Sequence, residues 1–201
     1  MAFPERTTVT TRLHLFCSIF IILQYSASSI RLPEFRRRYG RLAASRMLRF
    51  ALPLQVAAVC YRRRESALEF LLVNTNGGNK WTFPKGAPEP SLSHSQAAEQ
   101  EALEEAGVRG HIEPRHFHLY IHSKGVFWKS PGVREFVVKA FLMEVEHLEE
   151  SHEPMRNPTW FSPEDARKIL AKGREVKYAR EMQAVIDRAL EQLNAVKSAL
   201  R

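Results

Sequence analysis

Cysteine is scarce in this chain of 201 residues, which contains only Cys17 and Cys60. Two cysteines so far apart in the sequence define neither a disulfide framework nor a cysteine-based zinc site. We interpret Cys60 as a small apolar residue within a strand. This cysteine content fits a reducing compartment, so we expect a cytoplasmic protein.

Long apolar runs are also missing. The run at residues 13–23 is too short for an ordinary membrane-spanning helix, so we consider a membrane partner unlikely. Arg6 and Arg12 precede the run and small polar residues follow it, as in a secretory signal peptide, which would mean export. A membrane-surface anchor is a second alternative. We favour a loose extension or a misplaced start codon, with Met47 as a plausible true start.

Acidic residues are rare only at the beginning of the chain. Residues 1–50 contain nine Lys/Arg and two Asp/Glu, a net charge of +7, whereas residues 51–201 contain 21 and 20, a net charge of +1. The overall charge of +8 therefore belongs mostly to the first segment, and we expect no specific nucleic-acid partner. We divide the chain into a basic extension, 1–50, and one domain, 51–201. The oligomeric state cannot be inferred.

The domain mixes strands and helices, which predicts an α+β or α/β sandwich. Apolar and alternating runs predict strands at 55–61, 69–74, 116–122 and 136–143, the first two forming a hairpin. Helical signals predict helices at 94–106, 163–171 and 182–196. Residues 149–157 are polar, and we expect a mobile loop there.

The stretch from Trp81 to Val108 organises the domain. A short apolar run ends at Pro84-Lys85-Gly86, which predicts the end of a strand and a turn. Ser93 and Gln96 have the spacing of a capping box, and Gly107 is a good residue to end a helix. We therefore predict strand, loop, helix and stop.

Three glutamates, Glu101, Glu104 and Glu105, share one face of that helix because residues three and four apart are neighbours. In an arbitrary helix such a face is usually a solvated acidic stripe. The sharper interpretation is a site for a hard divalent cation, since carboxylate oxygens suit Mg²⁺ or Mn²⁺ and the cation would relieve the repulsion.

The spacing resembles the Nudix box, G-x5-E-x7-R-E-U-x-E-E-x-G-U, where U is a bulky apolar residue. The first glycine is Gly86, the R-E-U-x-E-E segment is residues 100–105, and the last glycine is Gly107. Two positions depart from the pattern, because Leu92 replaces the usual Glu and Gln100 the usual Arg. The glycines and the three glutamates are all present, in the expected strand-loop-helix context.

The resemblance covers roughly residues 52–172 and implies a Nudix fold, an α/β/α sandwich with a mixed sheet between helices. It implies hydrolysis of a phosphoanhydride bond with Mg²⁺ or Mn²⁺ as cofactor. By resemblance, Glu101 and Glu105 are metal ligands, Glu104 is a ligand or the base that deprotonates water, and the Gly86 carbonyl is a further ligand.

Basic residues are the candidates for contacting the phosphates of a small-molecule substrate. We select Lys85, which follows Pro84 directly, and Arg156, at a position where related proteins often carry a basic residue. Lys124 and Arg134 are further candidates, and Glu153 is a possible additional base. His116, His118 and His122 would line one strand face, where we interpret them as ordinary surface histidines.

The substrate is less defined than the chemistry. Pro84-Lys85-Gly86 and residues 104–110 resemble Nudix hydrolases of diphosphoinositol or diadenosine polyphosphates. Nucleotide-sugar hydrolysis, capped-RNA hydrolysis or an RNA 5′-pyrophosphohydrolase remain alternatives. The departures at Leu92 and Gln100 also leave open a ligand sensor without catalysis, and residues 1–50 a membrane-associated adaptor.

Overall fold

A computed structural model of the chain describes residues 52–65, 67–78, 80–124 and 134–199. Residues 1–50 lie outside the described part, so the division of the chain at residue 50 stays a prediction. In chain order, the elements are β1 (Leu54–Arg64), β2 (Ala67–Asn74), β3 (Trp81–Thr82), β4 (Lys85–Gly86), α3 (His94–Ala106), β5 (Val108–Ile112), β6 (His118–Lys124), β7 (Arg134–Leu148), η1 (Pro154–Arg156), β8 (Thr159–Phe161), α4 (Pro163–Ala171) and α5 (Val176–Ala199). None of the described helices is both long enough and apolar enough to cross a bilayer.

The described strands form one mixed sheet around β1 and β7. These two long strands pair in parallel, with Leu54 opposite Val137 and Tyr61 opposite Glu144. On its other side, β1 pairs antiparallel with β4 near its start and with β2 near its end. The far side of β7 pairs antiparallel with β6 and then with β5. The sheet therefore combines one parallel pair with antiparallel neighbours.

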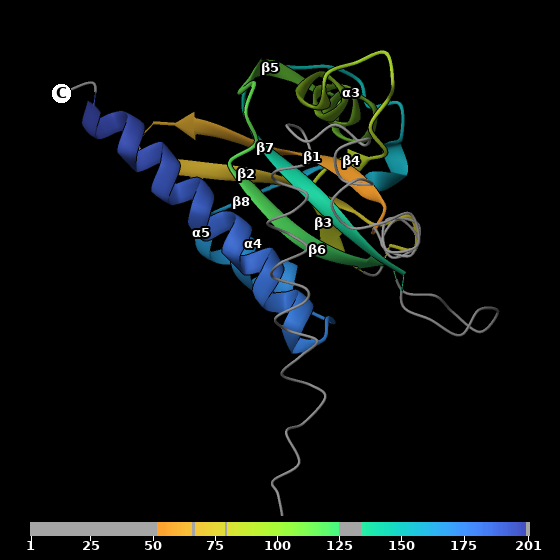
Figure 1. Cartoon of the computed structure of the whole chain (residues 1–201). Helices are drawn as coiled ribbons and strands as arrows, with labels where there is room; N and C mark the ends of the chain where they lie inside the picture. Colours follow the sequence, from red (N-terminus) through yellow and green to blue (C-terminus); the bar gives the residue numbers. More distant parts are fainter. Residues whose placement is uncertain (1–51, 66, 79, 125–133, 200–201) are drawn as a thin grey trace, which may run out of the picture. The chain divides into compact units, whose positions relative to one another are not determined.

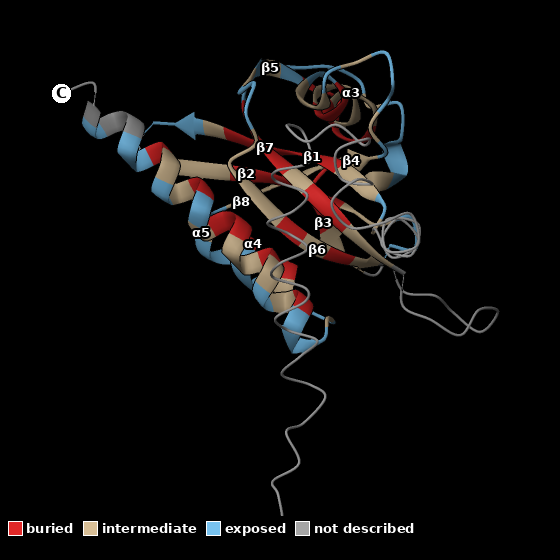
Figure 2. Ribbon diagram, viewed as in Figure 1, coloured by how far each residue is buried: buried red, intermediate tan, exposed pale blue. Residues whose placement is uncertain are grey.

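Helices cover both faces of this sheet (Figure 1). Because side chains alternate along a strand, Val56, Ala58 and Cys60 of β1 pack with the alanines of α3, whereas Ala57 and Val59 face α4 and α5. Figure 2 shows the buried residues concentrated in the strands and on the helix faces turned toward them. This arrangement confirms the predicted α+β sandwich with a mixed sheet between helices.

Several elements match the sequence-based predictions closely. The hairpin is present as β1 and β2, with Glu65 in the left-handed region at φ 59°. Ser162 caps α4, its hydroxyl accepting a hydrogen bond from the Asp165 backbone N–H at 3.1 Å. The C-terminal amphipathic helix is α5, which buries Met182 and Ile186 in the core.

One local prediction was wrong. Lys85 and Gly86 do not form a turn but a two-residue strand, β4, which pairs with Val56 and Ala57. The segment 149–157 is a loop, as expected, but it contains the short helix η1, and the Glu153 backbone N–H donates to the Glu104 carbonyl at 3.2 Å. Its mobility stays a prediction. Both features arise from contacts with distant elements, which local composition does not record.

Candidate active site

The helix that carries the three glutamates is fixed at both ends by its own sequence. The Ser93 hydroxyl accepts a hydrogen bond from the Gln96 backbone N–H, and the Gln96 side chain accepts one from the Ser93 backbone N–H, which confirms the capping box. Gly107 ends α3 in the left-handed region at φ 63°, its N–H donating to the Leu103 carbonyl at 2.9 Å.

Glu101 lies directly against Gly86. A Cβ atom at position 86 would stand 1.7 Å from the Glu101 Oε1 atom, so only glycine leaves room for this carboxylate. Burial, together with the negative charges of Glu105 and Glu104, raises the Glu101 pKa to about 7. Strand β4 and helix α3 therefore place the Gly86 backbone directly against the Glu101 carboxylate.

Glu105 is the most buried of the three, with 3% of its surface exposed. One oxygen accepts a hydrogen bond from the Lys85 backbone N–H at 3.1 Å, and the other forms an ion pair with the Arg156 guanidinium. Burial raises the pKa of Glu105, while the charges of Lys85 and Arg156 oppose that rise. The correction of Lys85 from turn to strand thus explains how its N–H reaches Glu105.

Glu104 is oriented differently from its two neighbours. Its carboxylate accepts a hydrogen bond from Gln100 Nε2 at 2.8 Å, and its backbone carbonyl accepts from Ser151 Oγ at 3.1 Å. Gln100 Nε2 also reaches Glu89 Oε1 at 3.5 Å, in the loop before α3. Leu92, the other departure from the box, packs against the core beneath α3.

The segment after β7 brings two further predicted residues to the glutamates. Arg156 Nε lies 2.6 Å from Glu153 Oε2, and another guanidinium nitrogen donates to the Asn74 carbonyl at 3.2 Å. Arg156 therefore joins Glu105, Glu153 and the end of β2. The sequence alone singled out Arg156 and Glu153, but not the Asn74 carbonyl or Ser151 that help to hold this segment in place.

The remaining basic candidates are placed less completely. Lys124 and Arg134 form the last register pair of β6 and β7, and their side chains lie outside the described part of the chain.

The histidines were not all interpreted correctly. His122 is buried, with 9% of its surface exposed, and the ring of His116 lies 6.1 Å from that of Phe141, on the α3 side of the sheet. His118 pairs with Ala140, which faces α5.

The three glutamate carboxylates of α3 can be compared with the ligands that a divalent cation needs. Among the described residues, no three Asp, Glu, His or Cys side chains are arranged around one point as a metal site. The carboxylates instead contact Arg156, the Lys85 N–H and Gln100. Three carboxylates on one helix, one of them pressed against a glycine backbone and with a raised pKa, nevertheless have the oxygen chemistry that a hard cation selects. The residues present fit such an ion.

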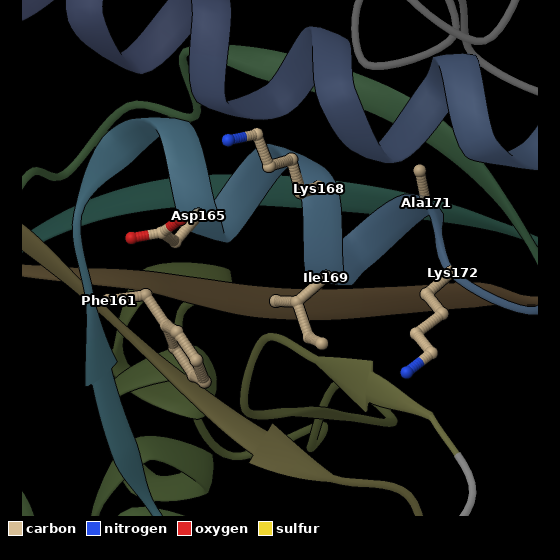
Figure 3. Close-up of a pocket in the computed structure, with 6 residues that line it drawn as sticks. All are labelled: Phe161, Asp165, Lys168, Ile169, Ala171 and Lys172. Atoms are coloured by element: carbon tan, nitrogen blue, oxygen red, sulfur yellow. The ribbon is translucent and has the colours of Figure 1, made fainter.

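A separate groove of about 690 Å³ lies along α4. Its lining consists of Phe161, Asp165, Lys168, Ile169, Ala171 and Lys172. Figure 3 shows the Phe161 ring and the Ile169 side chain on the same side of the helix, while Lys168 extends away from them. The groove contains none of the glutamates of α3, so it does not define the candidate active site.

Comparison with known proteins decides the family. Residues 52–182 match the family model of the NUDIX domain, and this match contains every element of the site described above. The chain belongs to the Nudix family. It is accordingly a pyrophosphohydrolase, an enzyme that hydrolyses the bond between two phosphates, and Nudix hydrolases generally use divalent metal ions.

Individual relatives agree with this assignment. The chain is 30% identical to human diphosphoinositol polyphosphate phosphohydrolase 3-alpha over 119 residues, covering 58% of this chain and 68% of that protein. A C. elegans Ap4A hydrolase binary complex has a TM-score of 0.51 and 27% identity, covering 72% of this chain and 99% of that chain. The NUDIX domain of Shewanella oneidensis NrtR, complexed with ADP ribose, shares the fold with a TM-score of 0.50 and 17% identity, covering 82% of this chain and 99% of that chain.

Proposed function

We propose that this Nudix hydrolase cleaves a phosphoanhydride bond in a polyphosphorylated small molecule, using Mg²⁺ or Mn²⁺ held by Glu101, Glu104 and Glu105. The observation that carries the proposal is the placement of Glu105. It is almost fully buried between the Lys85 N–H and the Arg156 guanidinium, one helical turn from Glu101. A buried carboxylate, Glu105, and a partly buried one, Glu101, beside fixed cationic groups suit the recognition of a cation-bound phosphate.

Each residue has a part in the proposed reaction. A bound divalent cation would neutralise the phosphate oxygens that repel an incoming nucleophile. Arg156 presents a planar guanidinium that can bind a phosphate through two hydrogen bonds, and Lys85 adds a second positive charge beside it. Glu104, whose carboxylate contacts only Gln100 among the described residues, is our choice to take the proton of the attacking water. Glu153, ion-paired with Arg156, is the second choice.

For the substrate, we propose a diadenosine polyphosphate or a diphosphoinositol polyphosphate. Support comes from the resemblance of residues 104–110 to hydrolases of these compounds and from the relatives named for them. Both substrates are strongly anionic, which suits a site that combines Arg156 with Lys85. The choice between the two rests on an experiment.

That experiment is a hydrolysis screen of the purified full chain with each candidate substrate, with Mg²⁺, with Mn²⁺ and with a chelator, the products being separated by chromatography. We expect turnover only with a divalent cation. Glu105→Gln should lower turnover by about two orders of magnitude, the scale for losing a key electrostatic group. Glu99→Gln is the matched control, since Glu99 lies on the same helix outside the box glutamates and should retain turnover. Equal turnover in the two variants, with folding verified, would refute the site.

A further inference from the structure

The side chain of Gln100 holds the carboxylate of Glu104. Gln100 Nε2 donates a hydrogen bond to Glu104 Oε1 at 2.8 Å, and both side chains are half-buried. The two residues are four positions apart in α3, so they are neighbours on one helix face. Among the described residues, the hydrogen bond reaches one oxygen of this carboxylate and none reaches the other, Oε2.

Glu104 differs in this respect from the other two glutamates of α3. Glu101 lies against a glycine backbone, and Glu105 is ion-paired with Arg156. A glutamate side chain without such contacts populates several rotamers, so a single orientation has to be fixed by a partner at a cost in side-chain entropy. In the described part of the chain, the hydrogen bond from Gln100 is the contact that fixes the carboxylate of Glu104.

The orientation of the Gln100 amide follows from its two neighbours. Its Nε2 atom also lies 3.5 Å from Oε1 of Glu89, in the loop between β4 and α3, and this longer contact is the weaker of the two. Ionised carboxylates only accept hydrogen bonds, so the amide must turn its NH₂ group, which has two donors, toward both of them. Gln100 therefore connects Glu104 to the loop as well as to its own helix.

We propose that Gln100 is a positioning residue for hydrolysis, which holds Oε1 of Glu104 so that Oε2 takes the proton of the attacking water. This inference rests on the function proposed above, in which Glu104 is the base. As the proton moves to Oε2, the water oxygen bonds to phosphorus, and the bridging oxygen leaves with the second phosphate. A carboxylate that turned freely would have the productive orientation for only part of the time, and turnover would fall accordingly.

The first test separates kcat from KM, using the substrate found in the hydrolysis screen. Gln100→Met should lower kcat about tenfold, the value of a hydrogen bond to a charged group, and leave KM unchanged because Gln100 acts on Glu104 rather than on the substrate. Gln100→Glu keeps the side-chain shape without the donor and should lower kcat at least as much, since like charges four residues apart repel. Gln96→Met is the matched control, because it removes a different side-chain hydrogen bond of the same helix, and it should keep kcat.

A double-mutant cycle shows whether Gln100 acts through Glu104. Glu104→Gln should lower kcat at least about a hundredfold, the scale for losing a general base, and adding Gln100→Met should cause no further loss. Equal kcat in Gln100→Met and the unaltered protein would overturn the proposal, and so would a tenfold loss that is repeated in the Glu104→Gln background. An unchanged kcat in Glu104→Gln would refute the base on which the proposal rests. Absence of turnover by the unaltered protein would refute the proposed function itself.

A second measurement tests the contact without turnover. In the metal-free full chain, NMR should show side-chain NH₂ resonances of Gln100 that shift in Glu104→Gln. The NH₂ resonances of Gln96 are the internal control and should stay in place, because the Gln96 side chain contacts the Ser93 backbone N–H instead. Gln100 resonances that do not respond to Glu104→Gln would overturn the contact, and with it the positioning role, even in an active enzyme.

Discussion

The guanidinium of Arg156 is ion-paired with the carboxylate of Glu105, and their side chains are only 11% and 4% exposed. The pair joins the segment after β7 to the helix that carries the three glutamates. A buried charge that loses its partner is costly, whereas an exposed one is not. This contrast leads to the first prediction.

Arg156→Met should lower the free energy of unfolding by about 3–5 kcal/mol, because it leaves Glu105 buried without its cation. Arg109→Met is the matched control, since Arg109 and Glu149 form an ion pair whose side chains are 48% and 45% exposed. The control should cost no more than about 1 kcal/mol. Urea unfolding at pH 8 without divalent cations measures both values. Equal losses would mean that the Arg156–Glu105 pair is not buried in solution.

Gly86→Ala tests the contact between strand β4 and Glu101. The added Cβ would stand 1.7 Å from Glu101 Oε1, so the carboxylate must move, although the end of a flexible side chain can do so without unfolding the protein. We expect turnover to fall about a hundredfold, the scale for displacing a catalytic group by an ångström, with little change in Tm. Gly77→Ala is the control, because a Cβ there meets nothing within 4 Å. Calorimetric titration with Mn²⁺ should show weaker binding in Gly86→Ala alone.

The pH dependence of stability should carry the signature of Glu101. Its pKa in the folded protein, about 7, lies above the ordinary value of 4.5, so the folded state binds this proton more tightly than the unfolded state. The resulting stabilisation is complete below pH 4.5 and is lost as the pH rises through 7. Glu101→Gln should therefore show a smaller fall in Tm between pH 5 and pH 8 than the unaltered protein, both measured in a chelator. An equal fall in the Tm of the two proteins between pH 5 and pH 8 would contradict a raised pKa of Glu101.

The two departures from the Nudix box give the fourth prediction. Leu92 is partly buried beneath α3, so Leu92→Glu should destabilise the protein by about 1–3 kcal/mol through an unpaired, partly buried charge. Gln100→Arg should change the free energy of unfolding by no more than about 0.5 kcal/mol, because Gln100 already reaches Glu89 and Glu104, whose carboxylates can accept hydrogen bonds from an arginine. Thermal unfolding of the single and double variants measures these changes. A loss of stability in Gln100→Arg as large as that in Leu92→Glu would contradict the prediction.

The sequence predicted best what depends on neighbouring residues. Ser93, Gln96 and Gly107 determine where α3 begins and ends through hydrogen bonds within four residues, and these were found as expected. The shared helix face of Glu101 and Glu105 likewise follows from helical geometry alone. The fold class, which the structure confirms, was predicted from the order of strand and helix signals along the chain and from the resemblance to the Nudix box.

Contacts between distant residues could not be predicted in this way. Arg156 reaches the Asn74 carbonyl across 82 residues, and that contact joins the polar segment after β7 to the end of β2. His116 was assigned by alternation to the face of His118, but it precedes β6 and follows a different backbone path. Lys139 could not be identified from the sequence, because a single lysine in an apolar strand carries no local signal. Its contact with His94, 45 residues away, is visible only in the structure.

The parallel pairing of β1 with β7 has a consequence for how the protein folds. Residues that face each other in this pair, such as Cys60 and Met143, are 83 positions apart, and α3 lies within the intervening loop. Closing so long a loop costs chain entropy before its contacts repay it, which slows folding. During synthesis, the helix can form its caps early, but Glu105 cannot meet Arg156 until β7 and η1 have emerged. The contact between Glu105 and Arg156 can therefore form only after residues 52–156 have been synthesised.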